Sequence, residues 1–256
     1  MAQRSPLLRV ESPASSVRGD CRECSLRFLC LTSALDREGL ARLQGVVQHP
    51  RPYARGRVLV RAGAPLRNLM VVRSGLLRTH RWDASDGRLI TGFVLPGEIA
   101  GLDAVADGRH RDSITAVDTS SVCLLAYPEV QALMRELPAL HEHFLRLLSH
   151  ELAKARDMLG LFGRRTARER VASVLVDLVD RQARRGLSST QLHLGMTWRD
   201  LASYLRLAPA TVSRALHELE ADGLLRSHGG EVMLQDPEAL RAMAGGAMRH
   251  RPERVV

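Results

Sequence analysis

Residues 197–234 restrict the fold more than any other part of the sequence, because they combine two short helices, a tight turn and a hairpin. Thr197-Trp198-Arg199-Asp200 is a typical helix start, in which a threonine and an acidic residue three positions later cap the backbone. Pro209 suits the first position of a second helix, and Gly223 ends that helix. The segment LLRSHGGEVML then predicts two strands that turn at His228-Gly229-Gly230. Elements in this order predict a winged helix-turn-helix.

The second helix of this unit carries side chains that suit the reading of double-stranded DNA. In such a unit, the N-terminal side chains of the second helix enter the major groove. Arg214 can donate two hydrogen bonds to a guanine, Thr211 and Ser213 can contact phosphates or base edges, and Ala210 offers only an apolar contact. Between Arg164 and Arg214, ten arginines stand against four acidic residues. We therefore predict DNA binding; the alternative for a helix pair of this shape is a protein interface.

Composition supports a globular protein with an anionic partner. Of 256 residues, 45% are apolar and 25% are charged, and the net charge is +9, which favours nucleic acid as a partner. No apolar stretch approaches the roughly 18 residues that a membrane span needs. Met1–Asp20 is rich in Arg, Ser and Pro and has no apolar core, unlike a signal peptide. We expect a cytoplasmic protein that makes no membrane contact.

Residues 57–127 predict a compact β domain. The apolar segments RVLV, NLMVV, GLLRTH, RLITGFVL, SITAV and SSVCLLAY are short, and eight glycines punctuate residues 56–108. This spacing is typical of a β barrel or jelly roll. From Pro138 onward the pattern becomes helical. We expect an α+β protein with a flexible tail (1–20), a cysteine arm and β sensor domain (21–137), a long dimerisation helix (138–164), a winged helix-turn-helix (165–245) and a second flexible tail (246–256).

The long helix carries an apolar stripe at the spacing of a coiled coil. The stripe recurs at steps of three and four residues and comprises Leu145, Leu148, Leu152, Ala155, Leu159 and Phe162. Such a stripe can meet a partner helix, so we predict a homodimer. The alternative is that the stripe packs on the β domain. However, a second apolar face is available for that contact, formed by Leu140, Phe144, Leu147 and Met158.

The four cysteines form a set that points to metal or redox chemistry. Cys21, Cys24 and Cys30 lie close together near the N-terminus, and Cys123 lies in a predicted strand. Cytosolic chains rarely keep disulfides, so clustered cysteines there indicate a metal site or a redox site. Four thiolates suit zinc or an iron–sulfur cluster. Three cysteines on a short arm with one remote partner favour the cluster, while zinc and thiol redox chemistry stay open.

The chain resembles the oxygen-sensing FNR branch of the CRP/FNR transcription regulators. The resemblance runs from about Cys21 to about Ala244 and rests on CRECSLRFLC, on the remote cysteine in SSVCLLAYPE, on the glycine-punctuated VVRSGLLRTHRWDASDGRLITGFVLPGEIAGLDAV and on TVSRALHELEADGLL. It implies a β-roll of the cyclic-nucleotide-binding type. It also implies a [4Fe–4S] cluster held by Cys21, Cys24, Cys30 and Cys123.

The resemblance further implies how such a regulator works. With the cluster intact at low oxygen, the protein dimerises and binds a palindromic operator; oxygen degrades the cluster and dissociates the dimer. The dimer stripe of this chain contains no acidic residue, so we expect its cluster-free form to dimerise more readily and its response to be shallower or tuned to other oxidants such as nitric oxide. RNA polymerase is the implied protein partner, contacted by charged loops such as Asp83–Arg88 and Glu98–Asp107, which we otherwise expect to be solvated surface.

Some residues depart from the family pattern. Relatives that bind cyclic nucleotides carry a Gly-Glu pair and an Arg-Ser pair, whereas this chain has Gly101-Leu102-Asp103 and Arg111-Asp112-Ser113. We therefore expect no control by cyclic nucleotides. Arg206 stands where the helix-turn-helix turn commonly contains glycine, which predicts a left-handed backbone at this residue. Ala210 stands where the family usually has glutamate, so the identity of the operator base pair that faces it is not predicted.

Other functions compete with the cluster sensor. A regulator of the same family could use haem or thiol redox chemistry instead of a cluster. A cupin-type metalloenzyme with a DNA-like domain needs several ligands in the β domain, yet His80 and His110 lack the paired spacing of such sites. We therefore expect no enzymatic activity. On the long helix, His141, His143 and His150 are expected to be solvated or at an interface.

Overall fold

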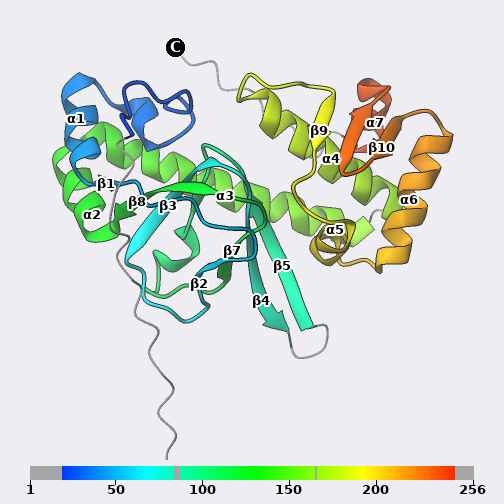
Figure 1. The fold of residues 1–256 in the computed structure, drawn as a ribbon, viewed down its shortest axis with the longest axis horizontal. Helices are drawn as coiled ribbons and strands as arrows, with labels where there is room; N and C mark the ends of the chain where they lie inside the picture. The colour runs from blue at the N-terminus through cyan, green and yellow to red at the C-terminus, as the bar shows by residue number, and fades with distance from the viewer. Residues whose placement is uncertain (1–18, 84–86, 165, 246–256) are drawn as a thin grey trace, which may run out of the picture.

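The computed structural model describes residues 19–83, 87–164 and 166–245. Figure 1 shows a β-rich N-terminal part, a long helix behind it and a second, mainly helical part toward the C-terminus. The two predicted tails lie outside the described residues, apart from Gly19 and Asp20. The α+β fold class and its three structural parts are as predicted.

The N-terminal part is a β-roll built from two four-stranded antiparallel sheets. One sheet has the order β1-β8-β3-β6 and the other the order β2-β7-β4-β5. The strands are β1 (Val47–Gln48), β2 (Val58–Val60), β3 (Asn68–Ser74), β4 (Leu77–Asp83), β5 (Gly87–Val94), β6 (Ile99–Ala100), β7 (Ser113–Ala116) and β8 (Ser121–Ala126). Each of the six apolar segments forms a strand. The short strands β1 and β6 were not predicted.

Strand β3 has two buried faces because successive side chains of a strand point to opposite sides. Met70 and Val72 lie in the core between the two sheets. Leu69 and Val71 face the other way, into a cluster with helical elements. Those elements are the 3-10 turn η1 (Leu31–Ala34) and helices α1 (Arg37–Gly45), α2 (Tyr127–Glu136) and α3 (Pro138–Arg164). A second 3-10 turn, η2, covers Leu102–Ala104.

Helix α3 is the long helix that the sequence predicts. At 27 residues it is about 40 Å long. Leu140 and Phe144 are buried in the cluster that also holds Leu31 of η1. Leu145, Leu152 and Leu159 are exposed. The helix therefore has one face on its own β-roll and an exposed apolar face.

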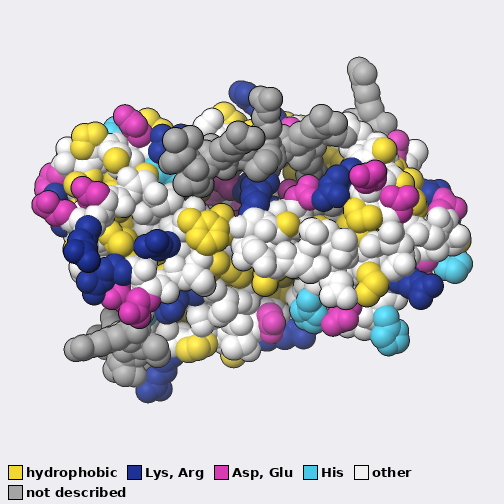
Figure 2. Space-filling view, turned by 90° about the horizontal axis from the view of Figure 1, so that it is seen from above, with side chains coloured by type: hydrophobic (Ala, Val, Ile, Leu, Met, Phe, Trp, Pro, Cys, Tyr) yellow, Lys and Arg dark blue, Asp and Glu magenta, His cyan; other side chains and the backbone are white. Residues whose placement is uncertain are grey.

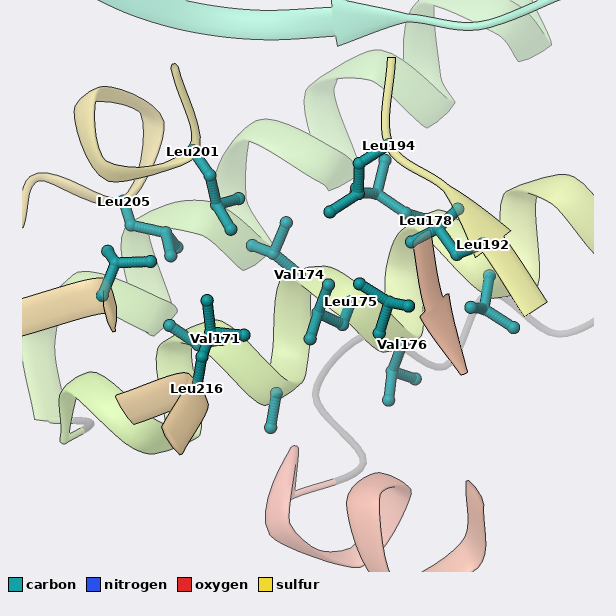
Figure 3. Packing of buried hydrophobic residues seen from close by; sticks show 14 of the residues in the cluster. Val171, Val174, Leu175, Val176, Leu178, Leu192, Leu194, Leu201, Leu205 and Leu216 are labelled. Carbon is teal, nitrogen blue, oxygen red and sulfur yellow. The ribbon is translucent and has the colours of Figure 1, made fainter. Parts of the chain in front are cut away.

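The C-terminal part packs around helix α4 (Ala167–Ala183), which a capping box of Thr166 and Glu169 starts. Figure 3 shows valines and leucines of α4 surrounded by Leu201 and Leu205 from α5 and Leu216 from α6. The remaining elements are α5 (Trp198–Leu205), α6 (Pro209–Ala221), the strands β9 (Gln191–His193), β10 (Leu225–His228) and β11 (Glu231–Leu234), and α7 (Pro237–Met243). The wing sheet has the order β10-β11-β9; β9 and α7 were not predicted.

Polar contacts join the β-roll to the C-terminal part. Arg78 Nη1 lies 2.8 Å from Asp200 Oδ1 at the start of α5, and Arg88 Nη2 lies 3.5 Å from the same oxygen. Glu98 pairs with Arg181 and Arg185 of α4. The expectation of solvated surface is therefore wrong for Glu98, which is half-buried and pairs with two arginines across the junction. Arg88 is exposed as expected, although it also reaches Asp200.

No described helix combines the length and the apolar character that a membrane crossing requires. Seen from above, basic and acidic side chains are interspersed, and hydrophobic side chains lie singly or in small groups (Figure 2).

Candidate metal centre and DNA-reading helix

All four cysteines line one pocket. Cys21, Cys24 and Cys30 come from the arm that precedes η1, and Cys123 comes from β8. All four are free thiols. The rest of the lining is apolar except for Thr32 and Arg73, and comprises Leu26, Leu31, Leu43, Val47, Val71, Val72 and Leu125. The structure thus brings together two segments about a hundred residues apart, as the cysteine pattern predicts.

Strand register and local turns explain this convergence. Cys123 pairs with Val71 of β3, so it lies on the sheet that the arm and α3 cover. The arm is a series of turns, with Arg27 N donating to the Cys24 carbonyl at 3.1 Å. Its start is tied to α1 by a hydrogen bond from Cys21 N to Gln44 Oε1 at 3.2 Å. Its end is tied by Thr32 Oγ1, which donates to the Arg27 carbonyl at 2.6 Å.

The thiols are held in a desolvating environment. Burial raises the pKa of Cys21 to about 11 and that of Cys123 to about 12, and it also raises the pKa of Cys30. The nearby Arg73 guanidinium opposes this rise at Cys21 and Cys123 without overcoming it. Reactive redox cysteines have a lowered pKa instead. With their raised pKa values, Cys21, Cys30 and Cys123 are protonated thiols at neutral pH and are weak nucleophiles.

The donor set consists of four thiols, which both iron–sulfur clusters and structural zinc sites use. Within the described ranges, no group of three or more His, Cys, Asp or Glu side chains could hold one metal ion. Four free thiols distributed around an apolar pocket are the ligands that a larger cluster uses. The cavity among them measures about 30 Å³, room for little more than a water molecule. The residues therefore fit a cluster in the chemistry of their donor atoms.

Two polar side chains beside the cysteines were not found by sequence reasoning. His49 is buried, and its Nδ1 lies 3.4 Å from Cys123 Sγ. Arg73 follows the buried part of β3 and is the one charged side chain in the lining of this pocket. Neither residue has a diagnostic spacing to a cysteine. Only the register that places β1 and β3 on either side of β8 brings them to the site.

Helix α6 presents the residues predicted to read DNA. Ala210, Ser213 and Arg214 are exposed, while Thr211 is half-buried. Arg214 Nη2 lies 3.5 Å from Thr211 Oγ1. Val212, Ala215, Leu216 and Leu219 of the same helix are buried. Arg206 ends α5 with φ 57° and ψ 43°, which confirms the predicted left-handed backbone in the turn.

The predicted dimer stripe on α3 is largely open in the single chain. The exposed fractions of Leu145, Leu152 and Leu159 are 54%, 53% and 71%, and Ala155 is exposed too. The two other members are half-buried within the chain. Leu148 packs against the cluster beneath α3, and the Phe162 ring lies 5.8 Å from the Arg170 guanidinium carbon. Four of the six predicted residues thus remain free to contact a partner.

The two segments that depart from the cyclic-nucleotide pattern of the family are bonded to each other. Asp103 Oδ2 accepts hydrogen bonds from the backbone N–H of Arg111 at 2.8 Å and of Asp112 at 3.3 Å. Its other oxygen lies 3.7 Å from His110 Nδ1. These contacts hold Asp103 against the segment that follows His110. The expectation that cyclic nucleotides do not control the protein stays a prediction.

Comparison with known proteins follows the same division of the chain. A cyclic nucleotide-binding domain matches residues 50–136, and a Crp-like helix-turn-helix domain matches residues 169–243. The transcriptional activator protein Anr of Pseudomonas protegens is 36% identical over 89% of this chain and 93% of its own length. The fumarate and nitrate reduction regulatory protein of Escherichia coli is 31% identical over 93% of this chain and 94% of its own.

A solved structure shares the fold. FixK2 from Bradyrhizobium japonicum superposes with a TM-score of 0.69 at 28% identity, covering 75% of this chain and 94% of FixK2. The β-roll, the long helix and the helix-turn-helix therefore define a DNA-binding transcription regulator and not an enzyme. The chain belongs to the CRP/FNR family of transcription regulators, and its similarity to Anr and to the fumarate and nitrate reduction regulator puts it in the FNR branch.

Proposed function

We propose that this regulator senses oxygen, or nitric oxide, through a [4Fe–4S] cluster bound by Cys21, Cys24, Cys30 and Cys123. The observation that carries the proposal is the meeting of these four free thiols in one apolar pocket. When bound, the cluster supplies an oxidant-sensitive centre. The protein's own part is to provide four sulfur ligands, to surround them with leucine and valine side chains, and to tie the arm to α1 and β8.

The proposed output is DNA binding by a homodimer. The exposed residues of the α3 stripe pair with the same residues of a second copy, because a symmetric dimer uses one patch twice. Ala210, Thr211, Ser213 and Arg214 of each copy then read one half of a palindromic operator. The regulator acts in the cytoplasm and contacts RNA polymerase there. Relatives named transcriptional activators support activation as the outcome.

Binding to an operator before and after exposure to air tests this proposal. The probe is a palindromic duplex that the anaerobic wild-type protein selects from a random-sequence pool. We expect tight anaerobic binding that weakens after air, and weak binding by Cys123→Ser under both conditions. Ser121→Ala, on the same strand, serves as the control and should match the wild type.

Cys123→Ser should keep the β-roll, because a serine at this position in β8 preserves the strand pairing. Circular dichroism checks this. If Cys123→Ser bound DNA as tightly as the wild type and responded to air in the same way, the four-cysteine sensor would be wrong.

A further inference from the structure

His143 connects the dimer helix to the cysteine arm. Its Nε2 lies 3.2 Å from the carbonyl oxygen of Cys30 and 3.0 Å from Ser33 Oγ. In the tautomer that carries its proton on Nε2, His143 donates to the Cys30 carbonyl, which can only accept. The expectation of a solvated or interface histidine is therefore wrong for His143, which contacts a segment of its own chain.

Packing around this contact makes it a stiff connection. Leu31, the residue after Cys30, has 1% of its surface exposed and lies in the same buried cluster as Leu140 and Phe144. Those two residues are on α3 on either side of His143. Close-packed side chains transmit small displacements because they have no free volume to absorb them. A shift of Cys30 therefore reaches α3 through both the hydrogen bond and the core.

The pocket gives Cys30 a reason to move. Cys30 lines the pocket together with the other three cysteines, so gain or loss of a cluster bound there changes the restraint on the Cys30 backbone. Cys30 is the last residue of the arm before η1, and its carbonyl oxygen is the one that lies beside His143 Nε2. Leu145, two residues after His143, is exposed on the α3 stripe. A displacement of the helix at His143 thus changes how Leu145 is presented to a second copy.

We infer that His143 is the positioning residue that couples the cysteine site to the dimer helix. Its hydrogen bonds reach the Cys30 carbonyl and Ser33 Oγ, and it acts by relaying the position of the Cys30 backbone to α3. This inference rests on the proposed cluster and dimer. It adds the residue through which the cluster site controls dimerisation.

The test compares three variants for iron content and for dimerisation. His143→Leu removes the hydrogen bonds and introduces an apolar side chain of similar bulk. His143→Gln instead keeps a side-chain N–H that can reach the Cys30 carbonyl. His141→Ala is the matched control, since His141 is exposed on the same helix and makes no side-chain hydrogen bond or ion pair among the described residues. Iron and acid-labile sulfide are assayed, and sedimentation gives dimer dissociation constants before and after air.

In the wild type, air should raise the dimer dissociation constant. In His143→Leu, with iron at the wild-type level, we expect this ratio to shrink by about 3- to 10-fold, the effect of about one hydrogen bond. His143→Gln should restore most of the ratio, and His141→Ala should leave it unchanged. An unchanged ratio in iron-loaded His143→Leu overturns the inference. A parallel loss of iron in both His143 variants overturns it too, because His143 would then only hold the arm. A wild-type protein without iron contradicts the proposed function instead.

Discussion

Arg181 of α4 and Glu98 of the β-roll form an ion pair that joins the two parts of the molecule. Arg181 Nε donates to Glu98 Oε1 at 2.8 Å, and Nη2 donates to Oε2 at 2.5 Å. Arg181 is buried and also pairs with Asp177 at 3.1 Å. Burial alone would raise the pKa of Glu98, but Arg181, Lys154 and Arg185 outweigh it and lower that pKa to about 2. The orientation of α4 against the sensor part depends on this pair.

Glu98→Gln should destabilise the protein, because it leaves the buried Arg181 guanidinium with less compensating charge. We expect the free energy of unfolding at pH 7 to fall by about 3 kcal/mol, measured by urea denaturation. Glu136→Gln is the control: Glu136 pairs with Arg42 at the surface, where such a pair contributes less than about 1 kcal/mol. Equal losses in the two variants would contradict the structural role of Glu98.

The same ion pair predicts a pH dependence. A carboxylate whose pKa is lower in the folded than in the unfolded protein stabilises the fold above the unfolded pKa. For Glu98 this stabilisation is complete above the ordinary value of 4.5 and is lost as the pH falls toward about 2. The difference in unfolding free energy between wild type and Glu98→Gln should therefore shrink as the pH is lowered from 5 to 2. A constant difference over that range would argue that the carboxylate charge does not matter.

Arg214→Ala should weaken DNA binding without affecting the fold, since Arg214 is exposed on α6. The expected loss in affinity for the selected duplex is about 10- to 100-fold, with relaxed preference at one guanine. Arg42→Ala removes the same charge from helix α1, in the N-terminal part, and should have little effect. Fluorescence anisotropy at fixed salt measures both, and equal losses would mean that only the net charge matters.

Leu152→Glu should disrupt the dimer, because it puts a charge in the middle of the exposed stripe on α3. We expect the anaerobic dimer dissociation constant to rise by at least about 10-fold, as burying an unpaired charge is costly. Leu187→Glu, an equal change at another exposed leucine, should leave the constant as in the wild type. Analytical ultracentrifugation distinguishes the two. A dimeric Leu152→Glu would place the interface elsewhere.

Arg73→Ala should impair retention of a cluster, because four thiolates around a cluster leave a negative charge and Arg73 is the cation that lines the described pocket. We expect less iron per chain and faster bleaching in air, and partial recovery in Arg73→Lys. Arg67→Ala, on an exposed residue at the start of the same strand region, is the control. Wild-type iron content and bleaching in Arg73→Ala would show that this charge is dispensable.

Sequence reasoning predicted the elements with strong local signals. Alternating apolar segments and glycine turns identified the strands of the β-roll, and the capping residues Thr197 and Asp200 marked the start of α5. The short strands β1, β6 and β9 carry too few residues for a periodic signal, and they form because neighbouring strands supply their partners. The cysteine spacing pointed to a shared site, and the pocket contains all four residues.

What the sequence could not reveal depends on contacts between distant segments. Glu98 looked like a surface charge because its partners, Arg181 and Arg185, lie on another part of the chain. His143 looked like one of three helix histidines, and only the position of η1 beneath α3 gives it a partner. The roles of the cysteines as cluster ligands, of the α6 residues in reading DNA and of the α3 stripe in dimerisation stay predictions.

The central claim is that the four cysteines hold an iron–sulfur cluster, and metal analysis of anaerobically purified protein tests it most directly. Iron and acid-labile sulfide should each be present at about four per chain. The accompanying visible absorption should fade over minutes after air is admitted, with release of iron. A colourless protein that carries zinc or no metal under strictly anaerobic conditions would contradict the account.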